Sequence, residues 1–119
     1  MTEKAVRKLR KELNSGTVAL VLLSVLDAAE EALYGYEIAR RLGGEDGEGL
    51  PVKQGALYPV LRSLEAQGFL DSSVEPSVSG PPRKYYSITD ECGEVLDAWK
   101  AEWTRTRDFV DKWLEGTSG

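Results

Sequence analysis

A mainly α-helical fold with one small β-hairpin and a long C-terminal helix is predicted by three features of the sequence. Leucines recur three and four residues apart between residues 54 and 66, and Gly68 follows as a helix-ending glycine. Two short segments of alternating character, residues 70–75 and 83–88, flank a proline-rich tip. From residue 92 to residue 113, side chains of mostly apolar type fall alternately four and three residues apart, as in a helix that packs along another helix.

Composition limits the chemistry of the chain. Its 119 residues suffice for one domain with a modest core. The chain has no histidine, and Cys92 is its one cysteine, so the usual general base and the common metal clusters are missing. We therefore expect no catalytic residues, no metal and no cofactor. The most apolar run, residues 17–26, is too short to span a membrane, which predicts no membrane contact and a cytoplasmic protein.

The first part of the chain predicts a basic start and two helices. Residues 1–13 carry five basic and two acidic side chains and form an N-terminal extension, either lying along a partner or DNA, or simply solvated. Residues 14–17 offer capping side chains, so a buried, nearly all-apolar helix is expected to begin there and to run to about Leu26. A second helix is expected next, with Tyr36, Ile38, Ala39 and Leu42 on its inner side. A glycine-rich acidic turn, residues 43–49, should follow it.

The helix predicted over residues 54–66 has two chemically different faces. One face carries Leu57, Val60, Leu61 and Leu64, and the opposite face carries hydrogen-bonding side chains, namely those of Gln54, Tyr58, Arg62 and Ser63. Pro59 requires the helix to start shortly before it, which leaves backbone amides free near residues 54–56 to bind phosphate. Such a helix, followed by an extended run, is typical of a reader of the DNA major groove. An ordinary amphipathic helix with a solvated face is the alternative.

The long C-terminal helix is expected to start at a cap formed by Thr89 and the two acids that follow it. At 1.5 Å per residue it is about 40 Å long, more than so small a domain can cover. We therefore expect part of its apolar stripe to pack on a second copy of the chain, with intrachain packing on the N-terminal helix as the alternative. The stripe comprises Cys92, Leu96, Trp99, Trp103, Thr106, Val110 and Trp113.

Three segments, in this order and spacing, resemble the PadR family of winged-helix transcriptional regulators. They are Leu33-Tyr34-Gly35-Tyr36-Glu37-Ile38-Ala39, then Gly55-Ala56-Leu57-Tyr58-Pro59-Val60-Leu61-Arg62-Ser63-Leu64-Glu65, then Gly80-Pro81-Pro82-Arg83-Lys84-Tyr85-Tyr86-Ser87-Ile88-Thr89. The chain departs from the family pattern at Pro81, where the family often has arginine, and by one extra residue between Thr89 and Gly93.

The resemblance implies a winged helix-turn-helix with a two-stranded β wing and a long C-terminal dimerisation helix. It divides the chain into the extension (1–13), a DNA-binding domain (14–88) and a dimerisation helix (89–116). It implies a homodimeric repressor that binds a pseudo-palindromic site on double-stranded DNA and is released by a small-molecule effector. The DNA-binding residues expected from the reading helix and the wing are Gln54, Gly55, Ala56, Tyr58, Arg62, Arg83 and Lys84.

The charge of the chain leaves a second interpretation open. The net charge is -5, whereas DNA-binding domains are usually basic. Residues 53–84 carry four basic and three acidic side chains, while residues 85–119 carry four basic and eight acidic ones, so the predicted reading elements are the less acidic part. A winged-helix module that binds protein, without specific DNA binding, remains the alternative.

Two tryptophans of the long helix form the candidate effector site. Trp99 and Trp103 lie one turn apart, and a two-fold axis through the seam would bring the indoles of two chains together. Space between flat rings suits a planar aromatic molecule, and the nearby Glu102 favours a cationic one. Family members that sense aromatic compounds use a tryptophan on this helix, which favours Trp103. The simpler alternative is that both residues are large core side chains.

Overall fold

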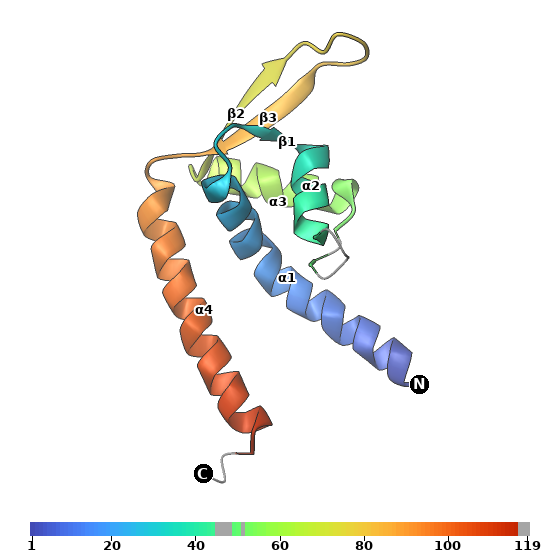
Figure 1. Ribbon diagram of the computed structural model, residues 1–119, viewed down its shortest axis with the longest axis vertical. Coiled ribbons are helices and arrows are strands. Elements are labelled where there is room, and N and C mark those ends of the chain that lie inside the picture. Colours follow the sequence, from blue (N-terminus) through green and yellow to red (C-terminus); the bar gives the residue numbers. More distant parts are fainter. Residues whose placement is uncertain (45–48, 51, 117–119) are drawn as a thin grey trace.

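The computed structural model describes residues 1–44, 49–50 and 52–116, and it forms four helices and three strands. The glycine-rich turn predicted at 43–49 lies mostly outside the described residues. In chain order the elements are α1 (Thr2–Ala28), β1 (Leu33–Tyr34), α2 (Gly35–Gly43), α3 (Gln54–Ala66), β2 (Leu70–Glu75), β3 (Arg83–Ile88) and α4 (Cys92–Leu114) (Figure 1). The mainly helical fold with a small hairpin is as the sequence predicts.

Helix α1 is one continuous helix, so the prediction of a new helix start at residues 14–17 is wrong. Instead of capping, Thr17 donates its hydroxyl to the carbonyl oxygen of Leu13 at 2.8 Å. Hydroxyl side chains within helices commonly bond in this way to the carbonyl four residues earlier. The residues on either side are good helix formers, and they carry the helix through this segment. Residues 2–13 of the predicted extension therefore belong to the exposed first half of α1.

The core forms where α1, α2 and α3 meet the sheet. It contains Leu22, Leu23 and Leu26 of α1, together with the leucines of α3 that the sequence places on one face. On α2, Ile38 and Leu42 are buried as predicted. Tyr36 is 56% exposed, so its predicted inner position is wrong; its ring stacks on that of Tyr34 instead.

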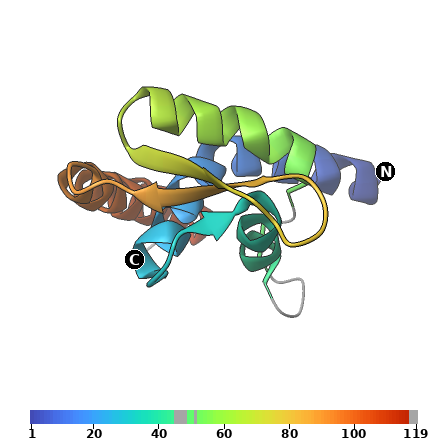
Figure 2. The same cartoon turned by 90° about the horizontal axis from the view of Figure 1, so that it is seen from above.

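The sheet has three antiparallel strands in the order β1-β3-β2. Strands β2 and β3 have the bounds that the sequence predicts, and their register pairs Leu70 with Ile88 and Glu75 with Arg83. The third strand, β1, was not predicted; its two residues pair with Tyr86 and Tyr85 of β3. The hairpin extends past β1 (Figures 1 and 2), and in the view of Figure 1 it projects beyond the helices, as a wing does.

Helix α4 begins at Cys92 and not at Thr89, and no side chain caps it. Thr89 is used elsewhere, which is why the predicted cap is absent: its hydroxyl donates to the carbonyl oxygens of Gly68 and Phe69. The helix starts beside α1, and the two helices then diverge toward their free ends (Figure 1). Cys92 and Leu96 are buried, whereas residues 101–116 are all exposed. Burial raises the pKa of the Cys92 thiol, with a smaller contribution from the charge of Asp27.

Candidate nucleic-acid interface

Helix α3 presents the candidate reading face. Leu57, Leu61 and Leu64 are buried, and Val60 is packed against the core. Gly55, Ala56, Arg62 and Ser63 are exposed on the other side. Pro59 lies just past the first turn, as predicted, so the hydrogen bond that its missing N–H would make is lost near the start of the helix. The apolar back of the helix thus holds it on the core with its polar side toward solvent.

A glycine ends α3 and turns the chain directly into the wing. Gly68 has a φ of 85°, a conformation that favours glycine, and its N–H donates to the carbonyl of Glu65 at 3.0 Å. The N–H of Phe69 donates to the carbonyl of Leu64 at 3.0 Å. Together these two bonds form a Schellman motif, and they fix the angle between α3 and β2.

The N-terminus of α3 offers fewer free amides than expected. The N–H of Ala56 donates to the carbonyl of Lys53 at 3.0 Å, so the expectation that it is free for phosphate is wrong. The first N–H groups of a helix have no acceptor four residues earlier within the helix, so they often bond to the carbonyl three residues earlier instead. Gln54 is the first residue of the helix, but its side chain lies outside the described part.

Tyr58 has a packing role in addition to its exposed surface. It is 42% exposed, and a side chain added at Gly35 would meet its hydroxyl at 3.0 Å. The Tyr58 ring therefore lies directly over the first residue of α2. This contact fits the alternative in which Tyr58 is a half-buried structural tyrosine.

The two cations of the wing point to opposite faces of the hairpin. Lys84 faces α3, where its Nζ lies 3.3 Å from Oε1 of Glu65, and its ammonium group also lies over the ring of Tyr86. Arg83 faces β1, with its guanidinium carbon 4.6 Å from the centroid of the Tyr34 ring. Both side chains keep exposed surface, but each is already held by a contact within the chain.

Glu65 makes a contact at this interface, although the sequence did not place it among the expected DNA-binding residues. Its carboxylate accepts hydrogen bonds from Ser72 of β2 and from Lys84 of β3. The Ser72 bond is the larger cause that holds the pKa of Glu65 below its ordinary value, and Lys84 adds to it. The bond to Glu65 raises the pKa of Lys84 in turn. Side chains alternate between the two faces of a strand, and the register of the hairpin puts Ser72 and Lys84 on the same face. This register could have indicated that both side chains face one partner.

An apolar groove of about 470 Å³ separates α1 from α4. Trp99 is fixed by an edge-to-face contact with Phe69, at 6.0 Å between ring centroids. Trp103, one turn on, is 42% exposed and lines the open groove. Glu102 also lines it, but its carboxylate is 2.7 Å from Arg105, and this bond lowers the pKa of Glu102. The groove thus has one free indole and an acid that is already paired.

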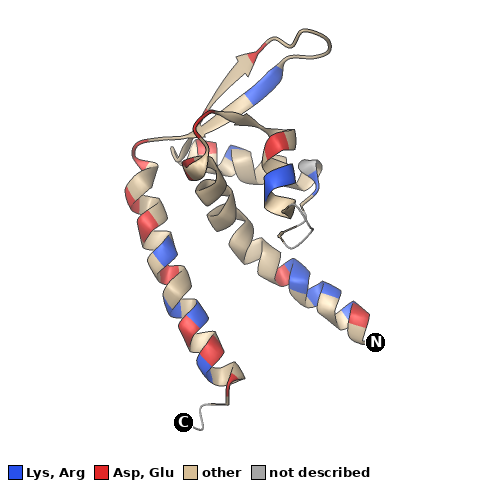
Figure 3. Cartoon of the chain, in the orientation of Figure 1, with Lys and Arg blue, Asp and Glu red and all other residues tan. Residues whose placement is uncertain are grey.

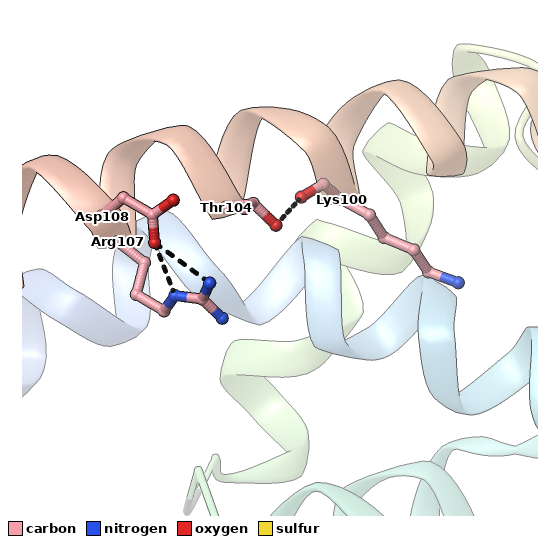
Figure 4. A network of polar contacts seen from close by, with 4 residues as sticks. All are labelled: Lys100, Thr104, Arg107 and Asp108. Atoms are coloured by element: carbon pink, nitrogen blue, oxygen red, sulfur yellow. Dashed lines mark hydrogen bonds and ion pairs between the residues drawn. The ribbon is translucent and has the colours of Figure 1, made fainter.

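Beyond the groove, α4 has an apolar and a polar side, and neither is covered. Trp113 is 63% exposed and contacts the ring of Phe109, while Val110 is also exposed. On the polar side, Thr104 donates to the carbonyl of Lys100 at 3.1 Å, and Arg107 binds its neighbour Asp108 (Figure 4). Beyond the groove, these polar groups of α4 therefore bond within their own helix, and the distal part of its apolar stripe stays open.

Charge is unevenly distributed over the molecule. Basic residues gather on the first half of α1, and acidic ones alternate with basic ones along α4 (Figure 3). Across the described residues, no group of histidine, cysteine and acidic side chains is arranged to hold a metal ion. In the same part of the chain, no helix combines the length and apolar character that crossing a bilayer needs.

Comparison with known proteins gives one consistent result. The profile of the transcriptional regulator PadR-like family matches residues 22–98. The structure is similar to that of a padr family transcriptional regulator from Eggerthella lenta, with a TM-score of 0.82. The two sequences are 36% identical, and the match covers 97% of this chain and 96% of that chain. A PadR-like transcriptional regulator from Bacillus cereus is 28% identical, and the match covers 88% of this chain and 98% of that chain with a TM-score of 0.69. A curated sequence relative, an uncharacterized protein of Lysinibacillus sphaericus, is 26% identical over 107 residues, which are 90% of this chain and 96% of that one.

Proposed function

Because the chain belongs to the PadR-like family of transcriptional regulators, we propose that it is a cytoplasmic repressor that binds a pseudo-palindromic operator as a homodimer. Residues 14–88 bind DNA and residues 89–116 dimerise. The first half of α1 packs against the partner. A small planar aromatic molecule releases the dimer from its operator.

The arrangement of two surfaces carries this proposal. The exposed side of α3 and the wing lie at the end of the molecule where α4 begins, and the uncovered stripe of α4 extends away from them (Figure 1). One end can therefore meet DNA while the other meets a second copy. On the DNA side, Arg62 projects from α3 toward the major groove. The backbone amides of Gln54 and Gly55, at the start of the helix, face phosphate. Ala56 and Tyr58 offer contact surface beside them, and Arg83 and Lys84 of the wing approach the adjacent backbone.

The shape of the single chain supports dimerisation. Its radius of gyration is 16.6 Å, against about 13.5 Å for a compact chain of this length. The excess comes from two diverging helices with exposed apolar side chains, Val6, Leu9 and Leu13 on α1 and the distal stripe on α4. A second copy of α4 lying in this opening would cover both sets. The interface then contains Trp99, Trp103, Thr106, Val110 and Trp113. Leu96, which the sequence also places on this stripe, is already buried within the chain.

A two-fold dimer fixes the geometry of the operator. Each copy brings one α3, so the site consists of two inverted half-sites, whose centres lie about 34–36 Å apart or at a multiple of this spacing. The effector enters the groove at Trp103, whose indole is free on one face, whereas Trp99 is already packed on Phe69. A guest wedged there changes the separation of the two α3 helices and so lowers the affinity for the operator.

Selection from a random-sequence DNA pool tests the proposal. We expect the protein to enrich an inverted repeat and to sediment as a dimer at micromolar concentration, alone and on the selected duplex. Enrichment of a single half-site, or a stable monomer, contradicts the proposed assembly.

One observation favours a second function, a winged-helix module that binds protein. Lys84 is paired with Glu65 and Arg83 is stacked on Tyr34, so the wing presents little free positive charge in a chain whose net charge is -5. The same selection separates the two functions, because a protein-binding module enriches no DNA sequence at low or moderate salt.

A further inference from the structure

The contact between α3 and the wing uses both oxygens of one carboxylate. Oε2 of Glu65 accepts the hydroxyl of Ser72 on β2, and Oε1 lies 3.3 Å from Nζ of Lys84 on β3. Glu65 lies in the last turn of α3, next to the Schellman turn that leads into β2. A single side chain thus connects the reading helix to both strands of the wing.

The position of this contact decides what it can control. Leu70 and Tyr86, at the base of the hairpin, are buried in the core and hold the base in place. Beyond the pair Ser72–Tyr86, the strands project away from the helices, and their side chains are mostly exposed. Glu65 therefore holds the hairpin where its anchored base gives way to its free end. An exposed ion pair adds little to stability, so its main effect is on the direction of the wing.

The pair also changes what the wing offers to DNA. An ammonium group beside a carboxylate attracts distant phosphates much less than a free one does, because the two charges cancel at distances large compared with their separation. Non-specific DNA binding depends on such unpaired cations, whereas specific binding depends on the correct placement of the contacts.

We infer that Glu65 is a positioning residue that determines specificity: it directs the wing and holds Lys84 in one place while suppressing sequence-independent attraction to phosphate. The inference rests on the proposed DNA-binding function. It differs from a purely structural role because it requires affinity for random DNA to rise, and affinity for the selected duplex not to rise, when the Glu65 charge is removed.

The first experiment measures affinity for the selected duplex and for a random-sequence duplex over a range of salt. Glu65→Gln keeps the size of the side chain and frees Lys84, so affinity for the random duplex should rise about three- to tenfold and its salt slope should steepen by about one. Affinity for the selected duplex should not rise, so the specificity ratio falls. Ser72→Ala leaves both charges in place and should lower the affinity for the selected duplex alone, with no change in salt slope.

Glu75→Gln is the matched control, because Glu75 is an exposed acid of the same wing and makes no ion pair within the described part of the chain. It should raise affinity for both duplexes equally and keep the ratio. If Glu65→Gln behaves like Glu75→Gln in a protein with unchanged thermal unfolding, the inference is overturned. If the wild-type protein does not prefer its selected duplex, the proposed function fails and the specificity role fails with it.

The second experiment needs no DNA. Trace acetylation of the native protein compares Lys84 with Lys53, an exposed lysine just before α3. The bond to Glu65 should make Lys84 less reactive than Lys53, and Glu65→Gln should raise the reactivity of Lys84 alone. Equal reactivity of Lys84 before and after the substitution shows that Glu65 does not hold it, and it overturns the inference even where DNA binding is intact.

Discussion

Thr89 donates its hydroxyl to the carbonyl oxygen of Gly68 at 2.8 Å. This bond joins two turns that are far apart in sequence, the one that ends α3 and the one that precedes α4. Next to it, Phe69 of the first turn meets the ring of Trp99 on α4. Helices α3 and α4 are therefore tied together at one point, through which movement of α4 can reach α3.

Replacing Thr89 by valine tests this link. The substitution preserves shape but leaves the carbonyl of Gly68 without its donor, so we expect the free energy of unfolding to fall by about 1 kcal/mol. Urea unfolding followed by circular dichroism measures it. Thr104→Val is the control, because Thr104 bonds only a carbonyl of its own exposed helix, and it should change stability by less than about 0.5 kcal/mol. Equal effects of the two substitutions would remove the special role of Thr89.

The close approach of Gly35 and Tyr58 gives a second prediction. A methyl group at Gly35 meets the Tyr58 hydroxyl at 3.0 Å, so Gly35→Ala should lower the free energy of unfolding by about 1 kcal/mol. Adding Tyr58→Phe removes the nearest atom and should recover part of this loss. Gly55→Ala, in open space on α3, should instead stabilise the protein by up to about 1 kcal/mol. A Gly35→Ala protein as stable as wild type would show that the ring moves freely.

Local patterns predicted much of this structure from sequence. The buried leucines of α3, the glycine that ends it and the bounds of the hairpin each depend on residues within a few positions of one another. The errors share another cause. Strand β1 exists only because Leu33 and Tyr34 pair with a strand some fifty residues later, and no local signal marks it.

The same reasoning applies to the caps and to the site. Thr17 and Thr89 both resemble helix caps in sequence. The hydroxyl of Thr17 instead donates to a carbonyl of its own helix, and that of Thr89 donates to a carbonyl in a distant turn. The sequence identified Lys84 as a cation of the wing, but its partner Glu65 lies on another element, so the pair follows only from the packing of α3 against the hairpin.

The apolar stripe of α4 should be the interface of a dimer. Val110→Glu and Trp113→Glu each place a charge where the proposed partner helix packs, and burial of an unpaired carboxylate costs several kcal/mol. Sedimentation equilibrium should show monomers for both. Thr104→Glu adds the same charge on the polar side of α4 and should leave the dimer intact (Figure 4). Intact dimers in all three variants would place the interface elsewhere.

The arginines of α3 and the wing should differ in what they do on DNA. Arg62→Ala should lower affinity for the selected duplex by about 1–3 kcal/mol and affect random DNA less, as expected for a residue that reads a base. Arg83→Ala should weaken both duplexes alike and reduce the salt slope by about one, as expected for a phosphate contact. Arg107→Ala on α4 should change neither. If Arg62→Ala weakens both duplexes equally, Arg62 contacts phosphate only.

The two tryptophans of the groove should respond differently to a planar aromatic cation such as ethidium. Trp103 has a free face in the groove, so the added dye should quench its fluorescence in a saturable way, and Trp103→Ala should abolish this quenching while the protein stays folded and dimeric. Trp99 is packed against Phe69, so Trp99→Ala should instead destabilise the fold by about 2–4 kcal/mol. Glu102 is paired with Arg105, so Glu102→Gln should change the affinity for a cationic dye only slightly, and by about as much as it changes the affinity for a neutral aromatic probe. Saturable quenching that survives Trp103→Ala would place the dye elsewhere and leave Trp103 as an interface residue only.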